Sequence, residues 1–323
     1  MARFGMTLSS EEHDPRALVE QARAAEAAGF DFVSISDHFH PWVTEQGHSP
    51  FVWSVLGALA EATDSIEVAV GVTCPTVRIH PAIVAHAAAT SALLLEGRFV
   101  LGLGTGEALN EHILGHRWPP PETRRAMLAE AVEVMRSLWT GETVDHDGDF
   151  YRVENARLFD VPDAGIPLVI SGFGQESVEL AARVGDGFWG HSPDADVIER
   201  YRDAGGEGPR YAQVRLCWDT DEERARETVH RQWPNQGLSG QLMQDLPTFT
   251  HFEQATSMLT VDQTAGSVPC GPDPAPVLEA VGSFLDAGYD HVYLHQVGGD
   301  VEGFVRFWRD ELSTELSGRA AAA

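Results

Sequence analysis

Short apolar segments alternate with helical patterns along almost the whole chain. The segments that predict strands are residues 3–6, 32–35, 67–73, 99–104, 168–172, 187–191, 214–218 and 291–296. Helical patterns occupy residues 15–28, 51–63, 81–95, 123–138, 177–184, 195–203, 221–233, 276–287 and 302–316. Because a helical pattern follows each strand, successive strands can run parallel in one sheet. We therefore predict an α/β fold, a single (β/α)8 TIM barrel over residues 1–323, rather than a doubly wound sheet.

Two segments interrupt this rhythm. Residues 143–153 predict a hairpin, with Asp147-Gly148 as a tight-turn pair. Residues 234–272 are polar and mixed, with weak periodicity. Active sites of such barrels lie at the C-terminal face of the strands. We expect residues 234–272 to be an insertion that crosses this face as a lid.

The charge balance is strongly acidic. The chain has 22 Lys plus Arg against 49 Asp plus Glu, a formal net charge of −27. Nucleic acids and anionic membranes require a basic face, so we expect neither as a partner. The sequence contains no lysine, so every basic side chain is arginine or histidine. Schiff-base chemistry, a lysine general base and a lysine phosphate clamp are therefore excluded.

Three features predict a cytoplasmic protein. The chain has no run of about 18 apolar residues, the length that a membrane-spanning helix needs. Its first residues lack the long apolar region of a signal peptide. Cys74, Cys217 and Cys270 are odd in number and far apart, which indicates reduced thiols rather than a disulfide framework.

The segment Ser-Asp-His-Phe-His-Pro-Trp at 36–42 directly follows a predicted strand. It places a carboxylate, two imidazoles and an indole at the barrel end where active sites are built. Histidine is the natural proton carrier near neutral pH. We interpret Asp37, His38 and Trp42 as a candidate catalytic cluster. The alternative is that His38 merely caps a neighbouring backbone group.

A glycine-rich turn, Leu-Gly-Leu-Gly-Thr-Gly-Glu-Ala-Leu-Asn-Glu at 101–111, follows the strand that begins at Phe99. Alternate glycines let a flat ligand approach the backbone. The spacing is not the dinucleotide-binding fingerprint, because the third glycine comes one residue too early. Glu107 and Asn110 can hydrogen-bond the edge of a ring, which makes the turn a candidate cofactor site. A tight turn with solvated acids is the alternative.

Two further strand ends carry turn residues. The segment 71–76 closes the third strand, and ordinary turn chemistry also accounts for its pattern. The segment 171–177 closes the fifth strand and begins a helix, where free N–H groups attract phosphate. Glu176 would repel an anion if its side chain faced the same way, so a plain helix cap is the alternative there.

A metal site is a competing interpretation of His38 and His40. Their His-x-His spacing is similar to the opening pair of metal-dependent amidohydrolases, which are also barrels. That pair normally ends the first strand, whereas here it ends the second. The bridging carboxylated lysine of some members cannot exist in this chain, but mononuclear members do not need it. A mononuclear metal-dependent hydrolase stays open as an alternative, while our preferred interpretation assigns no metal ligand.

Together these motifs resemble the luciferase-like oxidoreductases that use the deazaflavin coenzyme F420. The matching motifs are Ser-Asp-His-Phe-x-Pro-Trp at 36–42, Cys-Pro-Thr at 74–76, Gly-Thr-Gly-Glu-Ala-Leu-Asn-Glu at 104–111, Asp-Gly-Asp-Phe-Tyr-Arg at 147–152 and Gly-Asp-Gly-Phe at 185–188. The resemblance covers residues 3–190 well, weakens over 191–272 and returns near 291–297. The most similar branch contains the F420-dependent glucose-6-phosphate dehydrogenases.

The resemblance implies a deazaflavin in the barrel mouth and a role for each motif. His38 would exchange the substrate's hydroxyl proton, Glu107 would exchange a proton with the ring, and Trp42 would wall the pocket. The cofactor would be bound by Asp37, Gly71, Val72, Cys74, Thr105, Gly106 and Asn110, and its phosphate-bearing tail by Phe173, Gly174, Glu176 and Ser177. Family members often have a non-prolyl cis peptide at the end of the third strand, which we expect at Gly71–Val72.

The chain departs from the family where substrates bind. Sugar-phosphate members hold the substrate phosphate with lysines, and Asp194 and Gln254 stand near those positions here. We assign both, with His191, to the substrate pocket. An acid at such a position repels a phosphorylated sugar. The resemblance and this departure together imply an uncharged or apolar alcohol, carbonyl compound or activated alkene as substrate.

We therefore predict an F420-dependent dehydrogenase or reductase that moves a hydride between a non-phosphorylated substrate and the deazaflavin C5, and we expect a homodimer. Hydride transfer from an alcohol needs a base at the oxygen and a flat acceptor close by. His38 and the glycine-rich strand ends provide these features. The alternatives are an FMN-dependent luciferase-like monooxygenase, the metal-dependent hydrolase, and a cofactor-binding protein without catalysis.

Overall fold

The computed structural model describes residues 2–322, and these contain a closed barrel of parallel strands. The strands are β1 (Arg3–Leu8), β2 (Phe32–Ile35), β3 (Glu67–Thr73), β4 (Phe99–Leu103), β7 (Leu168–Ser171), β8 (Gly187–Gly190), β9 (Arg210–Leu216) and β10 (His291–Gln296). Around the barrel they follow the order β1, β10, β9, β8, β7, β4, β3, β2. The predicted (β/α)8 barrel is confirmed, and each predicted strand has its counterpart.

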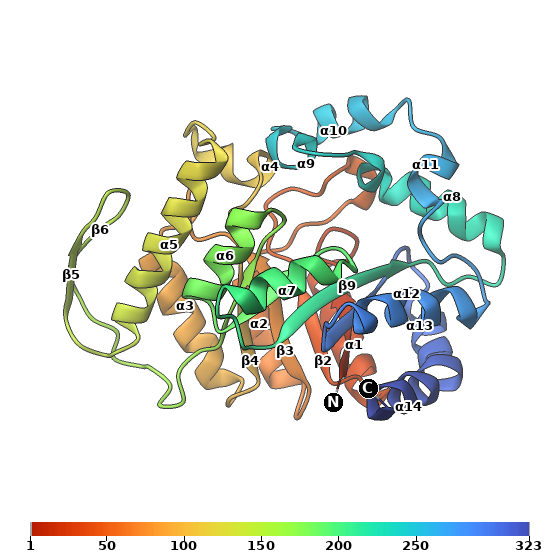
Figure 1. Ribbon diagram of the computed structural model, residues 1–323, viewed down its shortest axis with the longest axis horizontal. Helices are drawn as coiled ribbons and strands as arrows, with labels where there is room; N and C mark the ends of the chain where they lie inside the picture. The colour runs from red at the N-terminus through yellow and green to blue at the C-terminus, as the bar shows by residue number, and fades with distance from the viewer. Residues whose placement is uncertain (1, 323) are drawn as a thin grey trace.

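Helices surround the barrel (Figure 1). The helices outside the mouth are α1 (Pro15–Ala27), α2 (Val52–Ala62), α3 (Pro81–Leu94), α5 (Pro121–Leu138), α6 (Gln175–Val184), α7 (Ala195–Asp203), α8 (Glu222–Gln232), α12 (Pro274–Asp286), α13 (Val301–Phe307), a π-helical turn (Trp308–Leu312) and α14 (Ser313–Ala322). Asp14 caps α1 by accepting hydrogen bonds from the next backbone N–H groups, and Asp273 caps α12 in the same way. These caps fix where each helix begins.

The strands bury both of their faces. Outward side chains such as Leu8, Val33 and Val70 join the apolar layer beneath the helices. The inward cluster is Phe32, Ala69, Val100, Val169, Trp189, Tyr211 and Tyr293. Trp189 stacks on Tyr211 with ring centroids 4.8 Å apart, and its Nε1 donates to Tyr293 Oη over 2.8 Å. This packing fills the barrel interior, so ligand space is left at its mouth.

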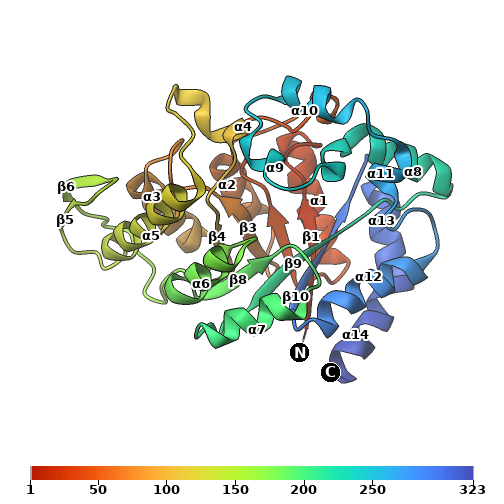
Figure 2. The ribbon, with the colours of Figure 1, turned by 45° about the horizontal axis from the view of Figure 1, so that its top comes forward.

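Residues 234–272 lie over one end of the barrel. They form η3 (Pro234–Gly237), α9 (Leu242–Asp245), α10 (Phe249–Thr256) and α11 (Val261–Ala265). Figures 1 and 2 both show α9, α10 and α11 gathered above the strand ends, near α4 (Ala108–Glu111) and α8. Glu253 Oε1 accepts a hydrogen bond from Thr44 N over 2.9 Å, which ties α10 to the loop after β2. The segment thus stands where we expect a lid.

The hairpin predicted around residues 143–153 is present outside the barrel. It consists of β5 (Val144–Asp147) and β6 (Arg152–Ala156), which pair antiparallel with Asp147 opposite Arg152. Residues 148–151 therefore form the turn, which is longer than the expected Asp-Gly pair. Glu130 Oε1, on α5, accepts from Tyr151 N over 2.8 Å and holds the turn against the helix.

Two further sequence expectations concern cysteines and membrane spans. Cys74, Cys217 and Cys270 are free thiols, as predicted. Cys217 and Cys270 belong to neighbouring backbone segments joined by an isolated parallel bridge. Within residues 2–322, no helix has the length and apolar character needed to cross a membrane.

Candidate active site

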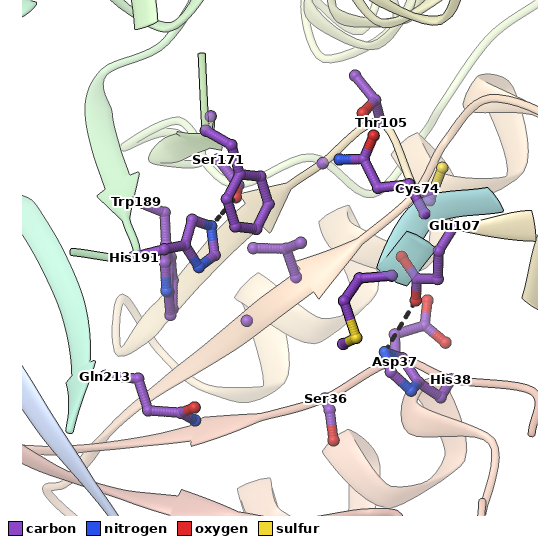
Figure 3. Close-up of a pocket in the computed structure, with 18 of the residues that line it drawn as sticks. Ser36, Asp37, His38, Cys74, Thr105, Glu107, Ser171, Trp189, His191 and Gln213 are labelled. Atoms are coloured by element: carbon purple, nitrogen blue, oxygen red, sulfur yellow. Dashed lines mark hydrogen bonds and ion pairs between the residues drawn. The ribbon is translucent and has the colours of Figure 1, made fainter. Parts of the chain in front are cut away.

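A cavity of about 410 Å³ opens at the C-terminal ends of the barrel strands (Figure 3). Seven of the barrel strands, and the residue that follows β4, contribute to its wall: Thr7, Ser34, Gly71, Gly104, Ser171, Trp189, Gln213 and Tyr293 are among the lining residues. Residues of the 234–272 segment complete the wall. The cavity therefore occupies the position where (β/α)8 barrels place their active sites.

His38 stands between two carboxylates in this cavity. Its Nδ1 lies 3.0 Å from Glu11 Oε1, and its Nε2 lies 3.0 Å from Glu107 Oε1. Glu11 comes from the loop after β1, His38 from the loop after β2 and Glu107 from the loop after β4. Figure 3 shows His38 and Glu107 directed toward each other. Three strand ends thus converge on one imidazole.

The two carboxylates set the charge of the imidazole. Burial alone lowers the pKa of His38, but the charges of Glu11 and Glu107 outweigh it and raise the pKa to about 10. Burial opposes ionisation of Glu11, yet the charge and hydrogen bonds of its partners, first His38 and then Ser36, lower its pKa to about 2. Burial opposes ionisation of Glu107 too, and His38 with Asn110 lowers its pKa. At neutral pH, an imidazolium therefore lies between two carboxylates.

Asn110 holds this cluster together. Its Nδ2 donates to Glu107 Oε1 over 2.8 Å, and its Oδ1 accepts from the backbone N–H groups of Phe39 and His40, each over 2.8 Å. Asn110 is buried and is absent from the cavity wall, so the structure gives it a positioning contact instead of the expected place beside the cofactor. It fixes Glu107 relative to the loop that carries His38.

Trp42 forms an aromatic wall next to His38. The indole meets the imidazole edge-on, with ring centroids 5.1 Å apart. On another side it meets Phe252 of α10 edge-on, also at 5.1 Å. Helix α10 therefore packs on the aromatic residue that bounds the cavity at His38.

Asp37 lies at the cavity wall with its carboxylate already engaged. The Thr73 hydroxyl donates to Oδ2, and Arg78 Nη2 lies 2.9 Å from Oδ1. Arg78 also contacts Glu111, because its backbone N–H donates to Glu111 Oε2 over 2.8 Å. The structure thus gives Asp37 an anchoring contact between β2 and β3, beside the cofactor contact that the resemblance implies.

The ends of β3 and β4 form a flat stretch of wall. The peptide bond Gly71–Val72 is cis, as expected from the resemblance. A Cβ at Gly71 would lie 2.5 Å from the Trp189 ring, so no larger residue fits there without movement. Gly71, Val72, Cys74, Thr105 and Gly106 all line the cavity. Residues predicted from separate motifs are therefore brought together on one side.

The start of α6 forms the adjoining wall. Phe173, Gly174 and Ser177 line the cavity there. Phe173 stacks on the His191 ring with centroids 3.7 Å apart and planes 8° apart. The Glu176 side chain pairs with Arg125 and does not line the cavity. The acid that would repel a bound anion is therefore neutralised and directed elsewhere.

The three residues assigned to the substrate pocket fall in different places. His191 lines the cavity, and its Nε2 lies 2.8 Å from Ser171 Oγ. Asp194 caps α7 by accepting from Asp196 N over 3.0 Å, and it does not line the cavity. Gln254 is exposed on α10 and does not line it either. The substrate-binding groups must therefore be sought elsewhere in the wall.

Several lining residues belong to no motif in the sequence. They include Glu11, Gln213, Arg215 and Trp233. β1 continues to Leu8, beyond the predicted end at Met6, which brings Glu11 close to the strand end. β9 begins at Arg210 rather than Val214, and alternate residues of a strand share one face. The period-two pattern from Tyr211 onward is the signal that points to Gln213 and Arg215.

The metal interpretation has no support in the described residues. Across residues 2–322, no group of three or more His, Cys, Asp or Glu side chains is arranged to hold a metal ion. His40 Nδ1 lies 3.0 Å from the Leu109 carbonyl oxygen, so His40 is engaged by backbone. His38 and His40 therefore have different partners: two carboxylates for His38 and a backbone carbonyl for His40.

Comparison with known proteins shows the family of this chain. F420-dependent glucose-6-phosphate dehydrogenase from Mycolicibacterium smegmatis is 36% identical over 329 residues, covering 97% of this chain and 98% of the relative. The enzyme of the same name from Nocardia farcinica is 36% identical over 330 residues, covering 97% of both. A solved F420-dependent secondary alcohol dehydrogenase in complex with an F420-acetone adduct has a TM-score of 0.88 at 29% identity, covering 96% of this chain and 97% of that one. The family model described as luciferase-like monooxygenase matches residues 1–291, and the chain belongs to this family.

Proposed function

We propose that the protein is an F420-dependent oxidoreductase that moves a hydride between a non-phosphorylated alcohol or carbonyl substrate, or an activated alkene, and C5 of the deazaflavin. F420 dependence and dehydrogenase activity are named for relatives that match nearly the full chain, and these parts of the sequence-based prediction are confirmed. The observation that carries the mechanism is the position of the His38 ring, with one nitrogen 3.0 Å from Glu11 and the other 3.0 Å from Glu107.

The residues on the β3, β4 and β7 side fit a flat cofactor. A Cβ at Gly104 would lie 2.8 Å from Val72 Cγ2, and one at Gly106 would lie 2.6 Å from Cys74 Sγ. Glycine at both positions therefore keeps this surface free of side chains. A Cβ at Gly174 would meet nothing within 4 Å, so there is open space where α6 begins. Free N–H groups at that helix start suit the phosphate of the cofactor tail.

The protein's own groups handle the protons. When bound, F420 supplies at its C5 the position that accepts or releases the hydride. In carbonyl reduction, His38 donates its Nε2 proton to the substrate oxygen. In alcohol oxidation, His38 must first lose that proton and then accepts the hydroxyl proton. Glu107, 3.0 Å from Nε2, is placed to exchange a proton on the cofactor side.

Glu11 has a positioning role in this scheme. It is buried at the cavity wall, and its Oε1 lies 3.0 Å from Nδ1 of His38. Ser36 Oγ donates to Glu11 Oε2 over 2.8 Å and holds it in place. A carboxylate at one imidazole nitrogen fixes the ring so that the other nitrogen faces the reaction. Here that other nitrogen is Nε2, which faces Glu107 and the cavity.

We further propose a cytoplasmic homodimer. The free thiols support a reducing compartment. Helix α3 supports the dimer, because Ile83, Leu93 and Leu94 are exposed on a helix that is apolar around its circumference. Helices with this pattern are normally buried. A second copy of the chain is the partner that would cover them.

Cofactor binding tests the proposed function. Apo-protein is titrated separately with F420 and with FMN, and a panel of alcohols and carbonyl compounds is then followed through the F420 absorbance near roughly 420 nm. We expect F420 to bind and to be reduced by at least one alcohol. Binding of FMN without binding of F420 would support the monooxygenase alternative instead. Stoichiometric zinc in the purified protein would revive the hydrolase alternative.

A further inference from the structure

A second polar wall faces the cavity from β9, β10 and η3. Around the barrel, β9 stands three strands from β2, the strand that leads to His38. Figure 3 shows Gln213 of β9 and His38 on separate sides of the cavity. Arg215 lies two residues further along β9 and also lines the cavity. A substrate held at His38 can therefore extend toward Arg215.

Arg215 is held in place by two side-chain amides, an imidazole and an indole. Its Nη1 donates to Gln236 Oε1 over 2.9 Å, and its Nη2 donates to Gln213 Oε1 over 3.1 Å. Its Nε lies 3.4 Å from Nδ1 of His295. The guanidinium also lies over the Trp233 ring, 4.5 Å from the centroid. A guanidinium has five N–H donors, so this rigid arrangement leaves donors for a ligand.

The charge of Arg215 has no directly bonded counter-charge in the described part of the chain. Glu12, which does not line the cavity, accepts from His295 Nε2 over 2.9 Å and from Gly298 N over 2.9 Å. Glu11 is engaged by His38. Burial lowers the pKa of Arg215, and the nearby acids do not restore it. Buried charges in proteins are normally paired, and a carboxylate bonded to Arg215 would complete the pairing here.

Two other arginines line the cavity, and Arg124, like Arg215, has no carboxylate partner among residues 2–322. Arg124 donates to the Gly106 carbonyl over 3.3 Å and so belongs to the cofactor side of the cavity. Arg125 pairs with Glu176. Beside Arg215, the Asn235 side chain lines the cavity, and its buried Oδ1 has no hydrogen-bond partner among residues 2–322. This orphaned oxygen is an acceptor, so it suits a donor such as the hydroxyl group of a ligand.

We infer that Arg215 binds a carboxylate of the substrate, so that the proposed oxidoreductase acts on a hydroxy acid or the corresponding oxo acid. One unpaired guanidinium matches the single charge and planar shape of one carboxylate. In oxidation, the carbinol C–H bond breaks and its electron pair leaves with the hydride to F420. The O–H proton passes to the protein, and a C=O bond forms. The substrate differs here from the uncharged compound expected from the sequence.

The inference rests on the proposed function, and a matched set of substrates and variants tests it separately. Lactate and propan-2-ol differ by a carboxylate in place of a methyl group, and 3- and 4-hydroxybutanoate extend the distance from the carbinol. The kcat/KM of each is measured with F420 in the wild type, in Arg215→Gln and in Arg215→Lys. Wild type should prefer one hydroxy acid, and Arg215→Gln should lose about 10- to 100-fold on it, chiefly in KM. Arg215→Lys should fall between.

Gln213→Glu provides a variant that should fold, because it gives Arg215 an internal carboxylate partner. Gln213→Glu should lower the kcat/KM for the hydroxy acid as much as Arg215→Gln does, and it should retain the affinity for F420. Butanoate binding, followed by tryptophan fluorescence, reports the subsite without turnover. Butanoate binding that requires Arg215, without any hydride transfer, supports the subsite and refutes the proposed function. Two results overturn the carboxylate subsite and leave the proposed function standing. One is F420-dependent turnover of alcohols with no preference for a hydroxy acid. The other is an equal loss of kcat/KM on hydroxy acids and neutral alcohols in Arg215→Gln.

Discussion

Replacing Glu11 with glutamine removes one of the two charges that hold a proton on His38. The substitution keeps the size of the side chain and leaves an oxygen near Nδ1. In the native protein, the carboxylates 3.0 Å away on each side raise the pKa of His38 to about 10, against burial. An opposite charge at such range moves a pKa by about 1–3 units, which corresponds to about 1.4–4 kcal/mol. Glu11→Gln should therefore bring the His38 pKa down to about 7–9.

The sign of the pH dependence follows from the mechanism. Below its pKa, His38 carries the proton that carbonyl reduction needs, so the reduction rate should fall as pH rises through about 10. Alcohol oxidation needs the neutral imidazole and should rise through the same range. In Glu11→Gln, both transitions should move to lower pH by the shift in the pKa. The pH profiles of reduction and of oxidation then report the pKa of His38 independently.

The assay is an NMR titration of histidine-labelled protein, with His38→Gln used to assign the resonance. The matched control is Glu12→Gln, since Glu12 is the adjacent buried carboxylate but pairs with His295. That control should leave the His38 pKa close to its native value. A His38 pKa that is native-like in Glu11→Gln, or that moves equally in both variants, would refute the electrostatic argument.

Three further outcomes are expected. His38→Gln should bind F420 normally but lose about 10²- to 10⁴-fold in kcat, the usual contribution of a positioned acid or base, as measured by titration and steady-state kinetics. Gly71→Ala places a Cβ 2.5 Å from an indole and should lower the free energy of unfolding in urea by about 1–3 kcal/mol, whereas Gly57→Ala meets nothing within 4 Å and should not. Ile83→Asp should convert the proposed dimer to monomer in light scattering, and Met258→Asp, at a residue 84% exposed on the lid, should not. A monomeric wild type would remove the basis for that last expectation.

Much of the fold follows from local pattern. Strands in a parallel barrel are apolar on both faces, so their segments stand out, and each is separated from the next by a helical period. Strand ends converge at one face, which is why motifs around His38 and Glu107 meet although they are far apart in sequence. For the same reason, the sequence predicts that Gly71, Val72, Cys74, Thr105 and Gly106 lie together, and all of them line the cavity.

The remaining site features depend on contacts between segments that are distant in the sequence, and no sequence pattern links such segments. The charge of His38 depends on Glu11, which lies beyond a strand that runs further than its apolar pattern suggests. The engagement of Asp37 depends on Arg78 from another loop. Residues of the lid cannot be placed from periodicity, because short helices and turns leave no regular pattern. Gln254 is assigned to the substrate pocket from the resemblance alone, and the structure places it exposed on α10, away from the cavity lining.

Transfer of a deuterium label tests the central claim most directly. Propan-2-ol and lactate, each deuterated at the carbinol carbon, are incubated separately with F420 and the protein, and reduced F420 is analysed by mass spectrometry and NMR. We predict that the active substrate delivers one deuterium to C5 per F420 reduced in the wild type, with transfer lost in His38→Gln. Reduced F420 whose new C5 hydrogen comes from solvent, or transfer that persists unchanged in His38→Gln, would contradict the account.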